Sequence, residues 1–207
     1  GPNRFFLFNG WNGLVTHPPV FREITKREDF DGYMIEVAVS ESAIHMAKKL
    51  DAEHILLIRP GSDPHLALAV ANKILKDHSE AVEERFIENF TDRESFERFK
   101  VLASSERFEA DRVAERIAPE PDYKERLEKG IRMIAHKLVQ PETVPINIPS
   151  VGLSQSSGVV AHCLWGNTMA MIGKYGLKPD STPAGGTLRI PGQINAESEV
   201  QGLSRKY

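Results

Sequence analysis

Polar residues and glycines gather in short turns, and each of these turns follows an apolar run of the sequence. A carboxylate at the mouth of such a turn can accept two hydrogen bonds from the N1 and N2 donors of guanine, and glycine lets the backbone approach a phosphate closely. The residues concerned are Asn9, Gly10 and Asn12, then Ser42, then Arg59, Gly61 and Asp63, and later Gly152, Ser154 and Gln155. The sequence therefore predicts a nucleotide site centred on the turn at residues 58–63.

The same residues can be explained without a nucleotide site, either as ordinary turns or as part of a hydrolase. Taken alone, residues 60–63 are a turn with a helix cap, and Asn12 is a turn residue in a left-handed conformation. The segment around Ser154 is one residue short of the nucleophile elbow of hydrolases. That fold needs a histidine after its acid, whereas His162 is the last histidine and precedes Asp180. We therefore predict no catalytic residue, and the histidine spacing predicts no metal ligand.

The elements that must position these turns alternate between strands and helices. Apolar runs predict buried strands at residues 5–8, 33–39, 54–58 and 144–149. Helical spacing predicts helices at 20–27, at 42–50 with Ser40 as N-cap and Ile44 on the apolar face, from Ser62 or Asp63 onward, through most of 80–137, and at 158–172. In the charged segment the expected packing residues are Phe86, Ile87, Phe90, Phe96 and Phe99. This rhythm is typical of the α/β class, a Rossmann-like parallel sheet flanked by helices, with a loop-rich C-terminal tail.

Length and composition set the remaining limits. The chain has 207 residues, of which 41% are hydrophobic and 27% charged, which is typical of one globular domain with a smaller appendage. We predict an α/β domain at residues 3–176 and a loop-rich tail at 177–207. A net charge of -3 from mixed acids and bases argues against nucleic acid as a partner, and no apolar run is long enough for membrane insertion. The single cysteine, Cys163, is expected in a helix core, and it favours a reducing, cytoplasmic location.

Taken in order, the turns resemble those of the molybdopterin oxidoreductases that carry a molybdenum or tungsten bis(molybdopterin guanine dinucleotide) cofactor, formate dehydrogenases among them. The most specific stretch, Ile58-Arg59-Pro60-Gly61-Ser62-Asp63, is close to the family's Ile-Arg-Pro-Gly-Thr-Asp turn. Three other segments are similar to family blocks: Gly10-x-Asn12 followed by His17-Pro18, Gly152-x-Ser154-Gln155 with Gly158, and Gly192-Gln193-Ile194-Asn195. The resemblance covers nearly the whole chain but only an inner part of a family member.

The resemblance implies a site and partners. It implies that Asp63 binds the guanine base and that further contacts to the dinucleotide come from Asn9, Gly10, Asn12, Ser42, Arg59, Gly61, Gly152, Ser154, Gln155, Gln193 and Asn195. Family enzymes place an iron–sulfur cysteine cluster and the metal ligand upstream, and a further domain downstream. The resemblance therefore implies a cofactor-binding portion that is incomplete for catalysis alone, working with other, iron–sulfur-containing domains or subunits of a Mo/W oxidoreductase.

Two departures from the family pattern leave an alternative open. After the second strand the family usually shows Asp-Pro-Arg, where this chain has Val39-Ser40-Glu41. Before Gly192 the family's Arg is replaced by Pro191. Loss of these charges fits a second hypothesis, a cofactor-free structural module of an electron-transfer complex.

Overall fold

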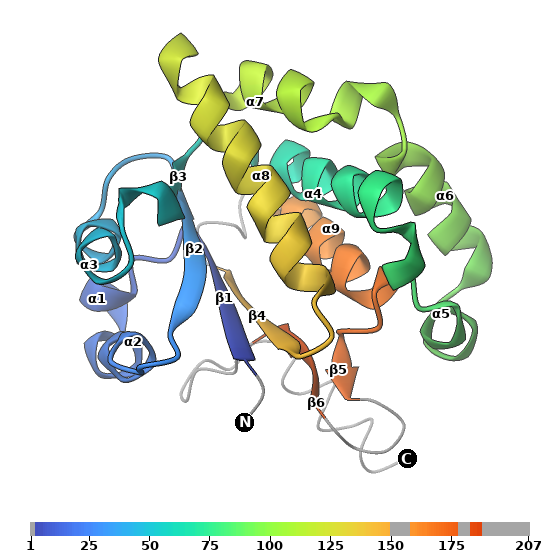
Figure 1. The fold of residues 1–207 in the computed structure, drawn as a ribbon, viewed down its shortest axis with the longest axis horizontal. Helices are drawn as coiled ribbons and strands as arrows, with labels where there is room; N and C mark the ends of the chain where they lie inside the picture. Colours follow the sequence, from blue (N-terminus) through green and yellow to red (C-terminus); the bar gives the residue numbers. More distant parts are fainter. Residues whose placement is uncertain (1–2, 150–157, 178–182, 188–207) are drawn as a thin grey trace.

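The computed structural model describes residues 3–149, 158–177 and 183–187. They form a parallel sheet with helices on both of its faces, which confirms the predicted α/β class (Figure 1). Among the described residues no helix is long and apolar enough to cross a membrane.

The sheet places β1 at its centre. Leu7 of β1 pairs with Tyr33 of β2 on one side and with Asn147 of β4 on the other, both in parallel. The strand order within the described residues is β3-β2-β1-β4-β6-β5, and only β5 runs antiparallel to its neighbour. The strands are β1 (Asn3–Asn9), β2 (Asp31–Glu36), β3 (Ile55–Leu57), β4 (Thr143–Pro149), β5 (Gly176–Leu177) and β6 (Pro183–Thr187). The chain thus reverses its direction of travel across the sheet between β1 and β4, where doubly wound folds bind ligands.

Alternate residues of β1 enter two separate cores. Phe6 and Phe8 point to one face, where they pack with Trp11 and Phe21. The helices on this face are α1 (Gly13–Thr16), α2 (Pro18–Thr25) and α3 (Glu41–Lys49). Gly13 is required here, since a Cβ at this position would lie 2.6 Å from the Trp11 ring.

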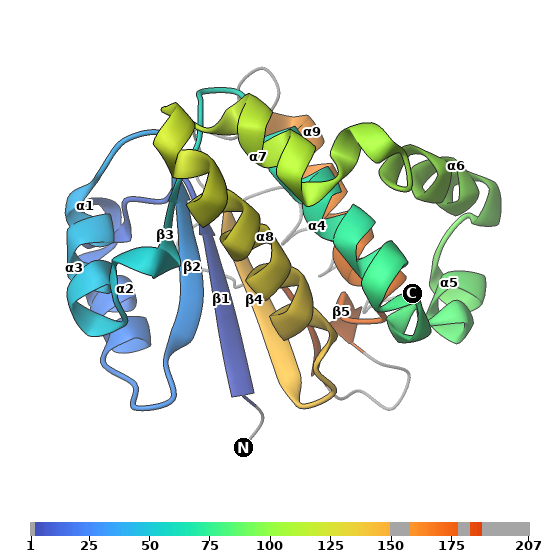
Figure 2. The same ribbon diagram turned by 45° about the horizontal axis from the view of Figure 1, so that its top comes forward.

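The larger core lies on the opposite face. Phe5 and Leu7 of β1 point into it, together with the buried residues of the helices on this side. These helices are α4 (Asp63–Asp77), α7 (Ala110–Ile117), α8 (Lys124–Val139) and α9 (Gly158–Met171). Helix α4 lies among the other three, and its residues 66–72 are all buried (Figures 1 and 2). Such an all-round burial explains why Leu66 to Asn72 include only one polar side chain.

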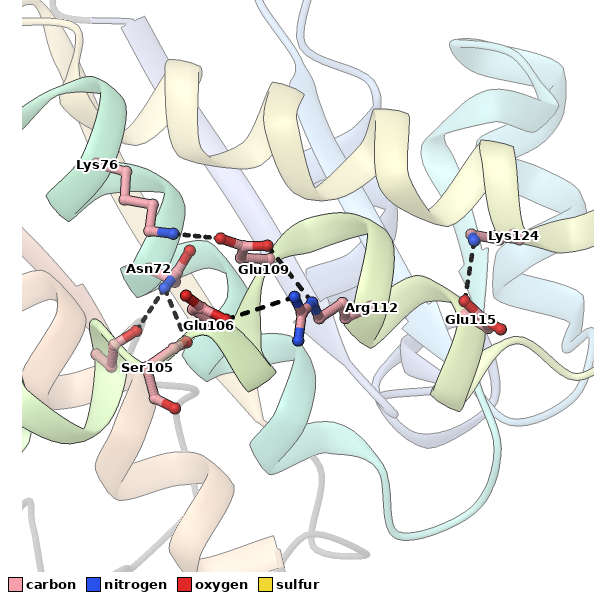
Figure 3. A network of polar contacts seen from close by, with 9 residues as sticks. Asn72, Lys76, Ser105, Glu106, Glu109, Arg112, Glu115 and Lys124 are labelled. Atoms are coloured by element: carbon pink, nitrogen blue, oxygen red, sulfur yellow. Dashed lines mark hydrogen bonds and ion pairs between the residues drawn. The ribbon is translucent and has the colours of Figure 1, made fainter.

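That polar side chain, Asn72, joins α4 to the end of α6 (Arg93–Ala103), which with α5 (Glu84–Phe90) forms the outer pair of helices. Its Nδ2 donates to the carbonyl oxygen of Ala103 at 2.7 Å and to that of Ser105 at 3.3 Å (Figure 3). Ala103 is the last residue of α6, where helix carbonyls lack internal donors, and Ser105 lies two residues beyond it. Asn72 is therefore a buried cap for another helix.

Two expectations, the end of β2 and the buried face of α3, were wrong. Strand β2 ends at Glu36 rather than at Val39, and both Val37 and Val39 are exposed. Ser40 caps α3 as predicted, but the buried face of α3 is formed by Ser42, Ala43 and Met46, and Ile44 is exposed. Apolar type alone misled the prediction in both places, because turns and helices also expose single apolar side chains.

Two further positions differ from expectation outside the sheet. Phe90 is 55% exposed at the end of α5, whereas the other four predicted packing residues of this segment are buried. Cys163 is exposed on α9 rather than buried. Helix α9 is apolar on nearly all sides, so its sequence gives no periodic signal for which side faces the core.

The segment predicted as a loop-rich tail contains part of the sheet. Its described residues include the end of β5 and the whole of β6, and β6 pairs in parallel with β4. Glycine and proline dominate the sequence of β6, Pro-Ala-Gly-Gly-Thr, which is why strand propensity did not reveal it. The rest of residues 177–207 lies outside the described residues.

Candidate functional site

The carboxyl ends of β1 and β4 meet at the reversal point of the sheet. Asn9, fully buried as the last residue of β1, donates from Nδ2 to Oδ1 of Asn147 in β4. The Oδ1 atom of Asn9 is also buried, and it accepts no hydrogen bond from the described part of the chain. Gly10 follows with φ of 63°, and its N–H donates to the Ile35 carbonyl at 2.8 Å. A buried amide oxygen without a donor is costly unless a ligand or water serves it.

The turn after β1 is joined to the start of α3. The hydroxyl of Ser42 donates to Oδ1 of Asn12 at 2.7 Å and accepts from the Leu14 N–H at 2.8 Å. The Nδ2 of Asn12 donates to Glu41 at 3.1 Å, and this hydrogen bond lowers the pKa of the Glu41 carboxyl. Asn12 and Ser42 were predicted to lie together, and they do. Their polar atoms are engaged with one another in this arrangement.

The turn after β3 is shaped by Gly61 and held by α7. Gly61 has φ of 75°, a conformation that favours glycine, and the Ser62 N–H donates to the Arg59 carbonyl at 3.1 Å. Arg59 reaches away from the turn: its backbone N–H donates to the Ile117 carbonyl at 2.9 Å and its Nε to the Ala118 carbonyl at 2.8 Å. The guanidinium of Arg59 is therefore placed beside the end of α7.

Asp63 begins α4 and is half-buried at this edge. Burial raises the pKa of its carboxyl, and a hydrogen bond to its own backbone N–H opposes that shift. No ion pair with a cation is formed by this carboxylate within the described residues. Pro64 follows and has no N–H, while the N–H groups of His65 and Leu66 donate to the Ser62 carbonyl. The backbone N–H groups at the start of α4 thus already have hydrogen-bond partners. The Asp63 carboxylate is the group of this turn that could bind a ligand.

Glu36 is a residue of this edge that the sequence reasoning missed. It ends β2, it is 8% exposed, and its Oε1 accepts from the Ser40 hydroxyl at 3.2 Å. Burial raises the pKa of the Glu36 carboxyl, and the Ser40 hydrogen bond opposes that rise. An acidic residue at the end of the second strand of a dinucleotide-binding sheet typically binds ribose hydroxyls. The signal was an acid that interrupts an apolar run, but the run was extended through it to Val39.

Two carboxylates and two buried amides therefore lie along one edge, on neighbouring strands. Such a set is rich in acceptors, which suits a ligand that presents N–H and O–H donors, such as a guanine base and a ribose. The predicted residues Gly152, Ser154, Gln155, Gln193 and Asn195 lie outside the described residues. Within the described ranges no three histidine, cysteine or acidic side chains are grouped for a metal ion.

Comparisons with known proteins add no family to this description. No protein-family model matches the chain, and no curated protein matches it.

Proposed function

We propose that this chain is the guanine-dinucleotide-binding portion of a molybdenum- or tungsten-dependent oxidoreductase that carries a molybdopterin guanine dinucleotide. It acts with further, iron–sulfur-containing domains or subunits and is incomplete for catalysis alone. The observation that carries the proposal is the half-buried Asp63 carboxylate at the carboxyl end of β3, which has no cationic partner among the described residues. A cytoplasmic location is proposed with it.

Three residues along this edge of the sheet would accept hydrogen bonds from the nucleotide. Asp63 would accept from N1 and N2 of guanine, a pair of donors that adenine lacks. Glu36 would accept from the ribose hydroxyls, and the buried Oδ1 of Asn9 would accept a donor of the ligand at the reversal point. The acceptors present match the donors that a guanosine offers.

When bound, the cofactor would supply the redox chemistry through its metal, while this chain binds and orients the nucleotide end. Burial of Glu36 and partial burial of Asp63 reduce the contact of their carboxyl groups with water, which strengthens hydrogen bonds to a ligand. Their roles are binding roles, and none of the described residues is assigned a chemical step.

The experiment compares nucleotides on the 207-residue chain by calorimetry. GDP, IDP and ADP are titrated, since inosine differs from guanosine only by the missing N2 amino group. We expect GDP to bind roughly tenfold more tightly than IDP, because a hydrogen bond to a charged group contributes about 1.5 kcal/mol or more. Asp63→Ala should abolish this preference. Asp111→Ala is the matched control, because Asp111 also lies in the first turn of a helix but is exposed.

Two results would overturn the proposal. One is equal binding of GDP, IDP and ADP by the unmodified chain. The other is loss of stability by about 1 kcal/mol in Asp63→Ala with unchanged nucleotide binding, which would mean that Asp63 only stabilises the first turn of α4. Elemental analysis for Mo and W on the protein purified with its partners tests the metal separately.

The alternative, a cofactor-free structural module, is favoured by one observation. The side chains of Asn12 and Ser42 already satisfy each other, so the turn after β1 is stable without a ligand. Under this alternative no guanine nucleotide binds, and Asn12→Ala loses stability in the absence of any ligand.

A further inference from the structure

Three arginines without a carboxylate partner lie around the start of α4. Arg59 contacts the end of α7, Arg116 is on the last turn of α7, and Arg107 precedes α7. The His65 ring lies 6.3 Å from the Phe108 ring, over which the Arg107 guanidinium is placed. Arg59 donates to the carbonyls of Ile117 and Ala118, directly after Arg116. Burial lowers the pKa of His65, and the charges of Arg116 and Arg107 lower it further. Among the described residues none of the three guanidinium groups forms an ion pair with an acid.

Two of these arginines are fixed in place by uncharged contacts. The guanidinium of Arg107 lies 4.6 Å from the centre of the Phe108 ring, and that of Arg59 is anchored at Nε by the Ala118 carbonyl. Each contact leaves the other N–H donors of the group free. A guanidinium held in this way loses less conformational entropy when it binds a carboxylate.

The neighbouring cations behave differently. Figure 3 shows Lys76 with Glu109, Arg112 with Glu106 and Glu109, and Lys124 with Glu115. The unpaired arginines therefore form a local positive surface on a chain whose net charge is -3. We name it the arginine surface: Arg59, Arg107, Arg116 and the neighbouring imidazole of His65.

We propose that the arginine surface docks an acidic face of a partner protein. All three arginines are exposed and come from three separate elements, the β3–α4 turn, the segment before α7, and the end of α7. A single phosphate needs donors that converge on one point, whereas several carboxylates on a protein surface match donors that are spread out. Arginine is also enriched at protein interfaces, while unpaired surface lysine is not.

This surface adjoins the turn that carries Asp63, because Arg59 belongs to both. A partner docked here would sit beside the nucleotide site without using the acceptors of Glu36 or Asp63. The inference does not depend on the proposed function, since it concerns charge that is present with or without a nucleotide.

The test measures binding of a fluorescent decaglutamate peptide to the 207-residue chain by anisotropy. We expect binding that weakens several-fold as NaCl rises from about 50 to about 300 mM. The double variant Arg107→Gln/Arg116→Gln should bind roughly tenfold more weakly. The matched control is Arg98→Gln/Arg132→Gln, which removes the same charge from arginines paired with Glu94 and Glu128 on their own helices. Circular dichroism establishes that both double variants fold.

The relative affinities of the two double variants support or overturn the proposed docking surface. Weaker binding by Arg107→Gln/Arg116→Gln, with the control within about twofold of the unmodified chain, supports the surface. An equal loss in both double variants overturns it, because the effect is then net charge only. Binding of inorganic phosphate that displaces the peptide at low millimolar concentration would instead identify a small-anion site. Equal binding of single-stranded DNA would identify a nonspecific polyanion surface.

Discussion

Two carboxyl groups at the carboxyl edge of the sheet are held away from water. The pKa values of both Glu36 and Asp63 are raised, and burial is the main cause in each case. A carboxyl whose pKa is higher in the folded than in the unfolded state favours folding when protonated. Stability from these groups is therefore present below the ordinary carboxyl pKa, and it falls as pH rises toward the raised value.

Glu36→Gln is expected to increase the stability of the protein at neutral pH, because the amide removes a buried charge and keeps an acceptor for Ser40. The gain should vanish below about pH 4, where the unmodified carboxyl is protonated in both states. Urea unfolding from about pH 3.5 to pH 7.5 measures it.

Glu41→Gln is the control of opposite sign. The pKa of the exposed Glu41 is lowered by Asn12, so this carboxyl stabilises the fold above its ordinary pKa and loses the effect as pH falls. Its variant should gain no stability at neutral pH. A gain of equal size in both variants would show that general charge, and not burial of Glu36, is responsible.

Sequence reasoning located part of this edge. Asp63, Asn12 and Ser42 were predicted because each stands in a polar turn after an apolar run, and a hydrogen bond joins Asn12 to Ser42 in the structure. Asn147, Arg107 and Arg116 were not found, whereas Arg59 was predicted as part of the turn after β3. The sequence alone does not show which strand pairs with β1 or which cationic side chains form ion pairs, since both depend on contacts between residues far apart in the sequence.

Edge strand β3 is covered by one hydroxyl group. The Oη of Tyr123 accepts from the Leu57 N–H at 3.1 Å and donates to the Ile55 carbonyl at 2.8 Å. Both backbone groups belong to an outer strand of the sheet, where unpaired N–H and C=O groups invite association with other strands. A side chain from the turn before α8 thus takes the place of a neighbouring strand.

Tyr123→Phe is expected to destabilise the protein by about 1–2 kcal/mol, because two backbone groups lose their partner. Chemical denaturation measures the loss, and hydrogen exchange should show faster exchange of the Leu57 amide. Tyr33→Phe is the matched control, because the Tyr33 hydroxyl makes no hydrogen bond within the described residues. Similar losses in both variants would contradict a role for the Tyr123 hydroxyl at the edge.

Asn72→Ala tests the cap between α4 and α6. Removing a buried donor leaves the carbonyls of Ala103 and Ser105 without it, and we expect a loss of roughly 2 kcal/mol. Asn89→Ala is the comparison, since its Nδ2 also donates to a backbone carbonyl but at an exposed position. If the two variants lose the same stability, burial of the Asn72 contact contributes nothing.

Strand β4 pairs with β1 although helices α4 to α8 separate it from β3 in the sequence. Lys174 fixes the approach: its Nζ donates to the Gln140 carbonyl at 2.5 Å and to the Thr143 carbonyl at 2.9 Å. This places the segment after α9 against the turn between α8 and β4. The contact joins the segment after α9 to the end of α8 and the start of β4.

Lys174→Met should keep the aliphatic stem but remove both hydrogen bonds, and we expect a loss of about 2 kcal/mol in free energy of unfolding. Lys48→Met on the surface of α3 is the control, with an expected change below about 0.5 kcal/mol. Guanidinium titration compares them. A loss confined to Lys48→Met, or absent from both, would rule out this role for Lys174.

At the scale of the molecule the sequence predicted the class of fold better than it predicted the arrangement of individual helices and strands. Alternation of apolar runs and helical segments indicated a parallel sheet with helices on both faces, which the structure confirms. The burial of α4 on every side and the strand at Pro183–Thr187 were not predicted. Periodicity reports one buried face, and it fails where a helix is surrounded or a strand is built from glycine.

The start of α4 has a consequence for ligand choice. Asp63, Pro64 and the Ser62 carbonyl leave no free donors in its first turn, so the usual phosphate seat of a nucleotide-binding helix is closed here. If a guanine nucleotide binds at this turn as proposed, its affinity would not depend on the number of phosphates. Guanosine, GMP and GDP would be held alike, and the base alone would decide which nucleotide enters.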